Sequence, residues 1–199
     1  MQAQRLEHSK EFRNAVPAAR QLRTACGGRL IITSKATEHL AAHPEVANIL
    51  PEAVGRIVLP PGGFMSAEVD MGRVVGRTTL VKTPPCDSNS PMLFAQRVGR
   101  VSPSHVVPSD TLGEETAKIV VLAQPSRDQA KTYLLVTSWI GGLADKEPWD
   151  RNIRTQNEYD RCVLFWCGHA LIHDPAVMGP VYESTWDEVM SDVAAVARN

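Results

Sequence analysis

The clearest hydrophobic pattern lies in the middle of the chain, where β-branched and aromatic residues gather in short runs. Residues 118–123 (KIVVLA) and 133–140 (YLLVTSWI) have the composition and length of strands. The polar stretch between them suits a longer hairpin loop, so we expect these two strands to pair antiparallel. Further strands are predicted at residues 30–33, 72–82 and 92–98. Residues 102–110 contain two prolines and are expected to be irregular or to lie at a sheet edge.

Helical patterns lie toward the two ends of the chain. Residues 6–25 are rich in Ala, Arg, Glu and Gln, which favour helix. A short helix is expected over residues 35–42, with Ser34 as its N-cap, followed by a further helical turn over residues 45–50. Prolines and a glycine pair interrupt residues 51–63, which we interpret as a connector.

Two more helices are expected in the last third of the chain. One covers residues 156–172, and the other begins after Ser184 as N-cap. Asp187 would then complete a capping box, with Asp in place of Glu. The apolar residues of this last helix recur at steps of three and four: Trp186, Val189, Met190, Val193 and Val196. We expect the first four of them to be buried.

This order of elements, with helices first and last and strands between, predicts an α+β fold. We expect one four- to five-stranded, mostly antiparallel sheet packed against N- and C-terminal helices. A chain of 199 residues suits a single domain. Within residues 1–199, the predicted parts are a mostly helical segment over 1–63, a strand-rich centre over 64–142, and a loop with C-terminal helices over 143–199.

Charge is nearly balanced, with a formal net charge of −1, so no overall field draws the protein to nucleic acid or to a membrane. The distribution is uneven. Basic residues dominate the first 35 positions: Arg5, Lys10, Arg13, Arg20, Arg23, Arg29 and Lys35. Acidic residues dominate the end: Asp174, Glu183, Asp187, Glu188 and Asp192. The basic head and the acidic tail can pair within one subunit or between subunits, or the head can bind a polyanion such as RNA.

The four cysteines, Cys26, Cys86, Cys162 and Cys167, show no C-x-x-C spacing, which argues against a thioredoxin-like motif and a zinc ribbon. The first residues carry no apolar run of the kind found in signal peptides. No apolar stretch approaches the roughly 20 residues needed to cross a bilayer. The protein is therefore expected to be cytoplasmic, away from membranes, with reduced thiols.

Several familiar site motifs are missing. The glycine pairs lack the G-K-[ST] ending of a phosphate-binding loop, and no G-x-G-x-x-G occurs. No G-x-S-x-G elbow is present. The acidic loop around Asp145, Glu147 and Asp150 lacks EF-hand spacing, and we expect a solvated or lid-like loop anchored by Trp149.

One candidate site is basic. Arg97 and Arg100 follow a predicted strand and precede Ser104 and His105. Guanidinium groups bind phosphate, and an imidazole can accept or donate a proton near neutral pH. Ser138, at the end of another strand and before a glycine pair, is a candidate substrate contact. Each of these residues also has an ordinary structural interpretation, as a charged edge or as a cross-strand hydrogen bond.

A second candidate site lies in the string CVLFWCGHALIHD. If these residues form one helix, Cys162, His169 and His173 share a face, while Cys167 points nearly the other way. Cys162 and His169 would be about 10 Å apart along the axis, too far to bind one ion. His169 and His173, four residues apart, would suit a zinc ion with further ligands from elsewhere. The alternative is a core face with histidines that form ordinary hydrogen bonds.

Five pieces of the chain carry a resemblance: GRTTLV (76–81), FAQRVGR (94–100), YLLVTSWIG (133–141), KEPWD (146–150) and FWCGHALI (165–172). On these pieces the chain resembles bacterial and phage proteins of unknown function. The resemblance covers about half the chain and implies that Arg97, Arg100, Ser138, Glu147 and His169 lie together. The strand-rich centre is also similar to small sheet-based RNases and bacterial toxin nucleases, which is an analogy of fold alone.

Three functions follow as hypotheses. The first is metal-independent cleavage of RNA phosphodiesters without a cofactor. Arg97 and Arg100 would bind phosphate, His169 or His105 would transfer protons, and Ser138 would position the substrate. The second is a non-enzymatic interaction module, such as a subunit of a phage or defence assembly, that associates with a protein partner or itself through the basic N-terminal helix. The third is a zinc-dependent hydrolase that uses His169 and His173.

Overall fold

The structure is a computed structural model that describes residues 20–60, 62–98 and 102–196. It is of the α+β class, and it contains several sheets where the sequence suggested one. The chain packs as two compact units that alternate along the sequence. Unit 1 comprises residues 1–76 and 117–140, and unit 2 comprises residues 77–116 and 141–199. This grouping differs from the three consecutive parts expected within a single domain, because strands distant in sequence pair with one another.

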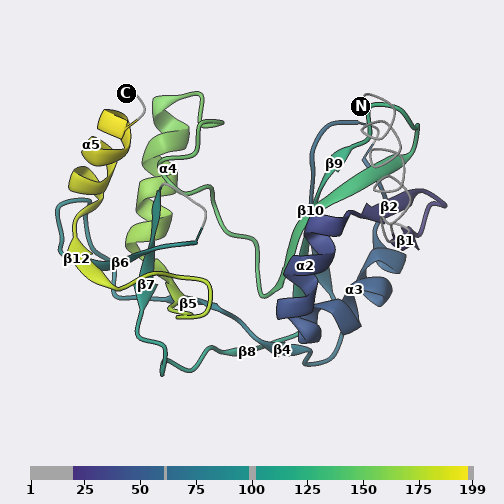
Figure 1. Ribbon diagram of the computed structural model, residues 1–199, viewed down its shortest axis with the longest axis horizontal. Helices are drawn as coiled ribbons and strands as arrows, with labels where there is room; N and C mark the ends of the chain where they lie inside the picture. The colour runs from purple at the N-terminus through teal and green to yellow at the C-terminus, as the bar shows by residue number, and fades with distance from the viewer. Residues whose placement is uncertain (1–19, 61, 99–101, 197–199) are drawn as a thin grey trace, which may run out of the picture. The chain divides into compact units, whose positions relative to one another are not determined.

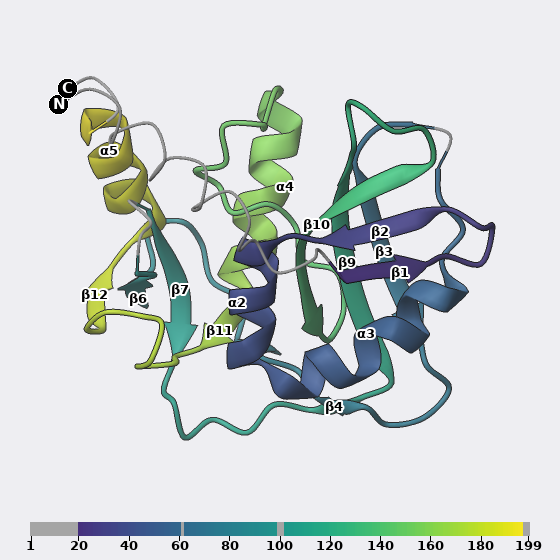
Figure 2. The ribbon, with the colours of Figure 1, turned by 45° about the vertical axis from the view of Figure 1, so that its right-hand side comes forward.

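Unit 1 contains a five-stranded sheet in the order β1-β2-β10-β9-β3. Its strands are β1 (Arg20–Arg23), β2 (Arg29–Ile32), β3 (Met65–Asp70), β9 (Lys118–Pro125) and β10 (Thr132–Ile140). The pairs are antiparallel except for β2 with β10, which run parallel. The expected hairpin of β9 and β10 is confirmed. Helices α2 (Ser34–Ala42) and α3 (Pro44–Arg56) pack on this sheet around one hydrophobic core (Figures 1 and 2).

Unit 2 contains a second five-stranded sheet in the order β12-β6-β7-β11-β5. Its strands are β5 (Leu80–Lys82), β6 (Met92–Gln96), β7 (Pro103–Val107), β11 (His169–Ile172) and β12 (Tyr182–Ser184). Helices α4 (Gln156–Cys167) and α5 (Trp186–Val196) contribute Trp166, Cys167, Trp186 and Val189 to its largest core cluster. Two short strands, β4 (Gly76–Arg77) and β8 (Glu115–Thr116), form a separate two-stranded sheet.

The prediction of an N-terminal helix over residues 6–25 is wrong for residues 20–23. Its first part, up to residue 19, lies outside the described residues. Arg20–Arg23 is strand β1, which pairs antiparallel with β2 in the register Leu22 with Leu30. Leu22 packs against the core of unit 1. The backbone bonds to β2 and this burial outweigh the helix preference of the arginines, since intrinsic propensity amounts to less than about 1 kcal/mol per residue.

The connector expected from residue 51 begins later, because α3 continues through Pro51 to Arg56. A proline within a helix removes one backbone hydrogen bond. The apolar residues Val46, Leu50, Ala53 and Val54 recur at helical steps and are all buried. Continuing the helix brings Ala53 and Val54 into the core, which offsets the lost bond.

Residues 103–107, expected to be irregular or at an edge, form the central strand β7 of the second sheet. Pro103 is the first residue of the strand, a position that tolerates a missing backbone N–H. The predicted strand over 72–82 is divided into β4 and β5, whereas Met65–Asp70, not predicted as a strand, forms β3. No helix among the described residues is long and apolar enough to cross a bilayer.

The helix expected over residues 156–172 ends at Cys167, which is a correction with consequences for the site. Gly168 is its C-cap, and His169–Ile172 continue as strand β11. This strand pairs antiparallel with β5 and parallel with β7. Its position between two strands satisfies more backbone groups than one more helical turn would, and Ala170 becomes fully buried.

The N-cap of helix α5 lies one residue later in the chain than expected. The hydroxyl of Thr185, in place of Ser184, accepts from the N–H of Glu188 at 3.2 Å. The Glu188 carboxylate accepts in turn from the N–H of Thr185 at 3.1 Å, which completes a capping box with Glu rather than Asp187. Trp186 and Val189 are buried as expected, whereas Met190 and Val193 are half-buried.

Candidate functional site

The candidate catalytic residues do not all belong to the same unit. Ser138 lies on β10 in unit 1, whereas Arg97, His105 and His169 belong to unit 2. An irregularity in β10 between Leu135 and Thr137 places Ser138 opposite Val121, on the core face of the sheet. The buried hydroxyl donates to the carbonyl of Val120 at 2.6 Å. Ser138 thus makes the cross-strand contact that was the alternative to a substrate contact.

His105 is a buried residue of β7, with only 5% of its surface exposed. Its Nδ1 lies 2.8 Å from the carbonyl oxygens of Trp166 and His169. Carbonyl oxygens only accept, so Nδ1 carries the proton. Burial lowers the pKa of the imidazole, although its two backbone bonds act in the opposite direction. His105 is therefore neutral at pH 7 and joins β7 to the end of α4.

Arg97 follows β6 and is half-buried, and its backbone forms an isolated bridge with Met178. The neighbouring N–H of Val98 donates to the carbonyl of Val177 at 2.9 Å. Arg100 lies outside the described residues. The expected clamp of two arginines is therefore represented in the structure by Arg97 alone.

His169 and His173 lie at the beginning and just past the end of β11, not on one helix. Four residues of extended chain span about 13 Å, so the two imidazoles cannot share an ion as the helical pair would. His169 Nδ1 donates to the carbonyl of Phe165 at 2.9 Å, and His173 Nε2 donates to that of Gly179 at 3.0 Å. Among the described residues, no group of three or more His, Cys, Asp or Glu is arranged to hold a metal ion.

The acidic loop before α4 is held to the rest of unit 2 by hydrogen bonds of its side chains and of its backbone. The indole N–H of Trp149 donates to the carbonyl of Pro103 at 2.9 Å, as expected of an anchor. The hydroxyl of Ser104 donates to the carboxylate of Glu147. The indole N–H of Trp166 in α4 donates to the carbonyls of Asp145 and Lys146 at 3.1 and 3.0 Å.

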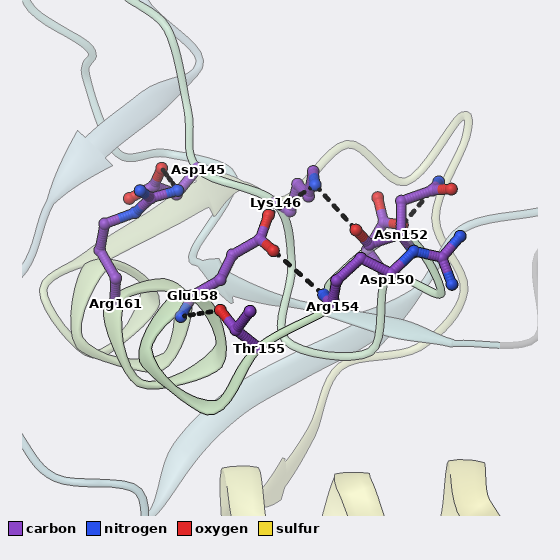
Figure 3. A network of polar contacts seen from close by, with 8 residues as sticks. All are labelled: Asp145, Lys146, Asp150, Asn152, Arg154, Thr155, Glu158 and Arg161. Carbon is purple, nitrogen blue, oxygen red and sulfur yellow. Dashed lines mark hydrogen bonds and ion pairs between the residues drawn. The ribbon is translucent and has the colours of Figure 1, made fainter.

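Charged side chains of this loop form hydrogen bonds and ion pairs with α4 and with the loop itself (Figure 3). Lys146 Nζ donates to the carboxylate of Glu158 at 2.7 Å and to the carbonyl of Asn152 at 3.0 Å. The hydrogen bond from Lys146 lowers the pKa of Glu158, and the bond from the N–H of Arg154 adds to this effect. Arg161 pairs with Asp145 at 3.3 Å. The ion pairs of this loop thus join it to α4, which supplies both Glu158 and Arg161.

A pocket of about 320 Å³ opens in unit 2, beside α4, the start of α5 and the loop before β6. The residues that line it are Cys86, Asp87, Ser88, Tyr159, Asp160, Val163, Leu164, Cys167 and Asp187. Its apolar wall includes Leu164, whose side chain is 73% exposed although it is large and hydrophobic. The pocket thus combines exposed apolar surface with three carboxylates.

The electrostatic environment of this pocket is negative. No lysine, arginine or histidine of the described chain lines it. None of the ion pairs found among the described residues involves Asp87, Asp160 or Asp187. Burial raises the pKa of Tyr159, and the nearby charges of Asp187 and Asp160 raise it further. These groups favour a positive charge near the Tyr159 hydroxyl.

Two thiols form part of the same pocket. Cys86 is half-buried, and its S–H donates to the carbonyl of Cys167 at 2.9 Å. Cys167 is buried at the end of α4. Burial raises the pKa of Cys167 to about 12, and Cys86 and the acidic side chains add to the shift.

The sequence indicated the helix and the loop that build this pocket but did not indicate that they meet. Its residues come from positions 86–88, 159–167 and 187, and only tertiary packing joins them. The one sequence feature that pointed toward this pocket was the acidic C-terminal region, which includes Asp187. The structure defines a two-unit α+β protein with a pocket in unit 2. Comparisons of the chain with protein-family models, with curated proteins and with solved structures give no match.

Proposed function

We propose that this protein is a binding module whose unit 2 receives a basic segment of a partner protein in the acidic pocket. The observation that carries the proposal is the combination of three aspartates and an apolar wall with no lining cation. Lysine and arginine have long apolar stems and charged ends, and such side chains bury the stem while the charge stays near water or a carboxylate. Val163 and Leu164 suit the stem, and Asp87, Asp160 and Asp187 suit the charge.

The hydrogen bonding of the candidate catalytic residues also favours binding over catalysis. The Ser138 hydroxyl and His105 Nδ1 are engaged with backbone carbonyls in buried surroundings. A catalytic hydroxyl or imidazole must reach a substrate atom within hydrogen-bond distance. Both side chains instead contribute to the cores of their own units, so the interaction module is the better of the starting hypotheses.

The binding proposal is tested with a fluorescently labelled peptide. A peptide with the sequence of residues 1–19 has the required chemistry, since it contains Arg5, Lys10 and Arg13 with Leu6 and Phe12. Fluorescence anisotropy with the full-length protein should give a Kd on the order of 10 μM at low salt. Binding should weaken as salt is added, because exposed charge pairs are screened.

Variants of the pocket locate the binding site. Asp160→Asn and Asp187→Asn should each raise Kd by up to about fivefold, since an exposed charge pair contributes about 1 kcal/mol at most. Asp192→Asn makes the same charge change on α5 outside the pocket and should leave Kd unchanged. Equal weakening by all three variants would refute the pocket as the site. A dimer in sedimentation that Asp187→Asn dissolves would identify the partner as a second copy of the chain.

RNA cleavage is a second candidate, favoured by the geometry of His169. Its ring stacks on Phe165 with centroids 4.1 Å apart and planes 3° apart. Because Nδ1 donates to a carbonyl, the neutral ring presents Nε2 as a proton acceptor with a fixed orientation. Arg97 is the arginine of the described chain that would bind phosphate in this hypothesis.

The RNA hypothesis predicts that His169→Ala lowers cleavage of a labelled RNA by about 10²- to 10⁴-fold, the usual contribution of a general base. The thermal melting point should stay near that of wild type. His173→Ala is the matched control, because it removes an imidazole from the same segment and should retain activity. No cleavage by the wild-type protein, or equal loss in both variants, would remove this candidate.

A further inference from the structure

We infer that Cys86 and Cys167 are a redox-active pair that closes to a disulfide in the wall of the acidic pocket when a low-molecular-weight disulfide is supplied. The two cysteines are 81 residues apart in sequence, yet Cys86 Sγ lies 2.9 Å from the Cys167 carbonyl oxygen. After burial, the neighbouring Cys86 thiol is the next cause that raises the pKa of Cys167, as a group close to it would. A disulfide forms only between cysteines whose backbones lie close together, and the contact from Cys86 Sγ to the backbone of Cys167 brings the two residues side by side.

The pocket gives a small oxidant access to the pair. Both cysteines line the cavity of about 320 Å³, so a reagent that enters it comes beside Cys86, the more exposed of the two. Cys26 and Cys162 are not among the residues that line this pocket. Cys162 is fully buried within unit 2, and Cys26 belongs to unit 1. The pair is therefore distinguished from the other two cysteines by the contact from Cys86 to the Cys167 backbone and by its place in the pocket wall.

The reaction with oxidised glutathione proceeds by two exchanges. The Cys86 thiolate attacks one sulfur of the glutathione disulfide, and one glutathione leaves as a thiolate that takes up the proton lost by Cys86. The Cys167 thiolate then attacks the Cys86 sulfur of the mixed disulfide and releases the second glutathione, which takes up the remaining proton. The protein loses two protons and two electrons, and glutathione disulfide gains them as it becomes two molecules of glutathione.

Cys86 is the first nucleophile because it is half-buried in the pocket wall, whereas Cys167 is only 2% exposed. The raised pKa of Cys167, about 12, makes its thiolate scarce at neutral pH. Because only the thiolate attacks, the closing step should become about tenfold faster with each unit by which the pH rises toward that value. The low thiolate fraction of Cys167 is offset because Cys167 is held close to the mixed disulfide on Cys86, which raises its effective concentration.

The disulfide would also regulate the pocket, and this part of the inference rests on the proposed binding function. It would join the loop that carries Asp87 and Ser88 to the end of α4. The Cys86 sulfur would be drawn toward Cys167, and the pocket would become narrower. The oxidised protein should therefore bind the basic peptide more weakly than the reduced protein.

The test is peptide mapping by mass spectrometry of the full-length protein after incubation with oxidised glutathione, with no peptide ligand present. We expect a cross-link between the peptides that contain Cys86 and Cys167, with a mass about 2 Da below the sum of the two reduced peptides. Cys162→Ser and Cys26→Ser should both retain the cross-link. Cys167→Ser should instead stop at a Cys86–glutathione mixed disulfide, about 305 Da heavier than the reduced variant.

A wild-type protein that keeps Cys167 as a free thiol, or that cross-links Cys26 or Cys162 instead, would overturn the inference. The wild-type map decides this even where a cysteine variant fails to fold. Peptide affinity is then measured separately on oxidised and reduced protein. A confirmed disulfide with no peptide binding in either form would reject the binding function and keep the redox pair. Peptide binding without a disulfide would keep the binding function and reject the redox pair.

Discussion

Cys26 shows how a turn can change the chemistry of one side chain. It lies in the turn between β1 and β2 and is exposed to solvent. Its sulfur is 3.4 Å from the hydroxyl of Thr24 and accepts from the N–H of Leu59 at 3.4 Å. The bond with Thr24, followed by those with the backbone N–H groups of Leu59 and Gly28, lowers the pKa of Cys26 to about 7. Such donors stabilise the thiolate more than the thiol.

We therefore predict that Cys26 is the most rapidly alkylated cysteine of this protein at neutral pH. The thiol form dominates below the pKa of about 7, so the rate with iodoacetamide should rise with pH and level off above that value. Mass spectrometry of the modified peptide as a function of pH measures this rate. Burial raises the pKa of Cys162, which should stay unmodified over the same range.

Thr24→Val provides the control for the cause of this shift. It removes the hydroxyl with little change in shape, so the midpoint of the alkylation profile should move to higher pH. An unchanged midpoint in this variant would mean that Thr24 does not stabilise the thiolate.

At the scale of elements, the most consequential feature is the change from helix to strand at Gly168. Residues on either side of it, Cys167 and His169, belong to α4 and β11. Amphipathic spacing alone favoured one continuous helix, because the apolar residues on both sides of Gly168 are compatible with a helical period. Residues 169–172 form a strand instead, because β11 pairs through hydrogen bonds with both β5 and β7. The zinc hypothesis depended on that continuous helix.

Helix α5 illustrates the opposite case, in which local signals were nearly sufficient. Its apolar period predicted burial of Trp186 and Val189, and both are buried. Trp186 packs edge-on against Phe94 of β6, with ring centroids 4.9 Å apart and planes at 88°. Two details differed: Met190 and Val193 are half-buried, and the cap lies one residue later, at Thr185 in place of Ser184.

At the scale of the whole molecule, the chain passes three times from one unit to the other along its sequence. Each unit has its own five-stranded sheet and its own hydrophobic clusters. Leu50 of α3 is 1% exposed in the core of unit 1, and Trp186 of α5 is fully buried in that of unit 2. Separate cores imply that stability is distributed over two groups of elements.

We predict that core truncations act mainly within their own unit. Leu50→Ala should cost about 2–5 kcal/mol and Trp186→Ala about 3–5 kcal/mol, because each leaves a cavity. Hydrogen exchange measured by mass spectrometry should accelerate in α2, α3, β9 and β10 for the first variant. It should accelerate in α4, α5, β6 and β7 for the second. Equal acceleration throughout the chain in either variant would show one cooperative unit instead of two.

The sequence by itself determined the features that depend on neighbouring residues. These are the α+β class, the β9–β10 hairpin, helix α2 and the amphipathic face of α5, all set by local propensity and by periods of two or 3.6 residues. The N-cap of α2 is Thr33 in place of the expected Ser34, because the Thr33 hydroxyl accepts from the N–H of Ala36. Trp149 as a loop anchor was also predictable, since a large aromatic ring with an N–H donor seeks both burial and a partner.

Tertiary structure alone decided how distant segments meet. It made Arg20–Arg23 a strand, placed β7 at the centre of a sheet, ended α4 before His169 and assigned Ser138 to a different unit from Arg97 and His169. It also formed the acidic pocket with Cys86 beside Cys167. The physical reason is that burial and strand pairing reward contacts between residues far apart in the chain, and a local pattern contains no information on which distant segment supplies the partner.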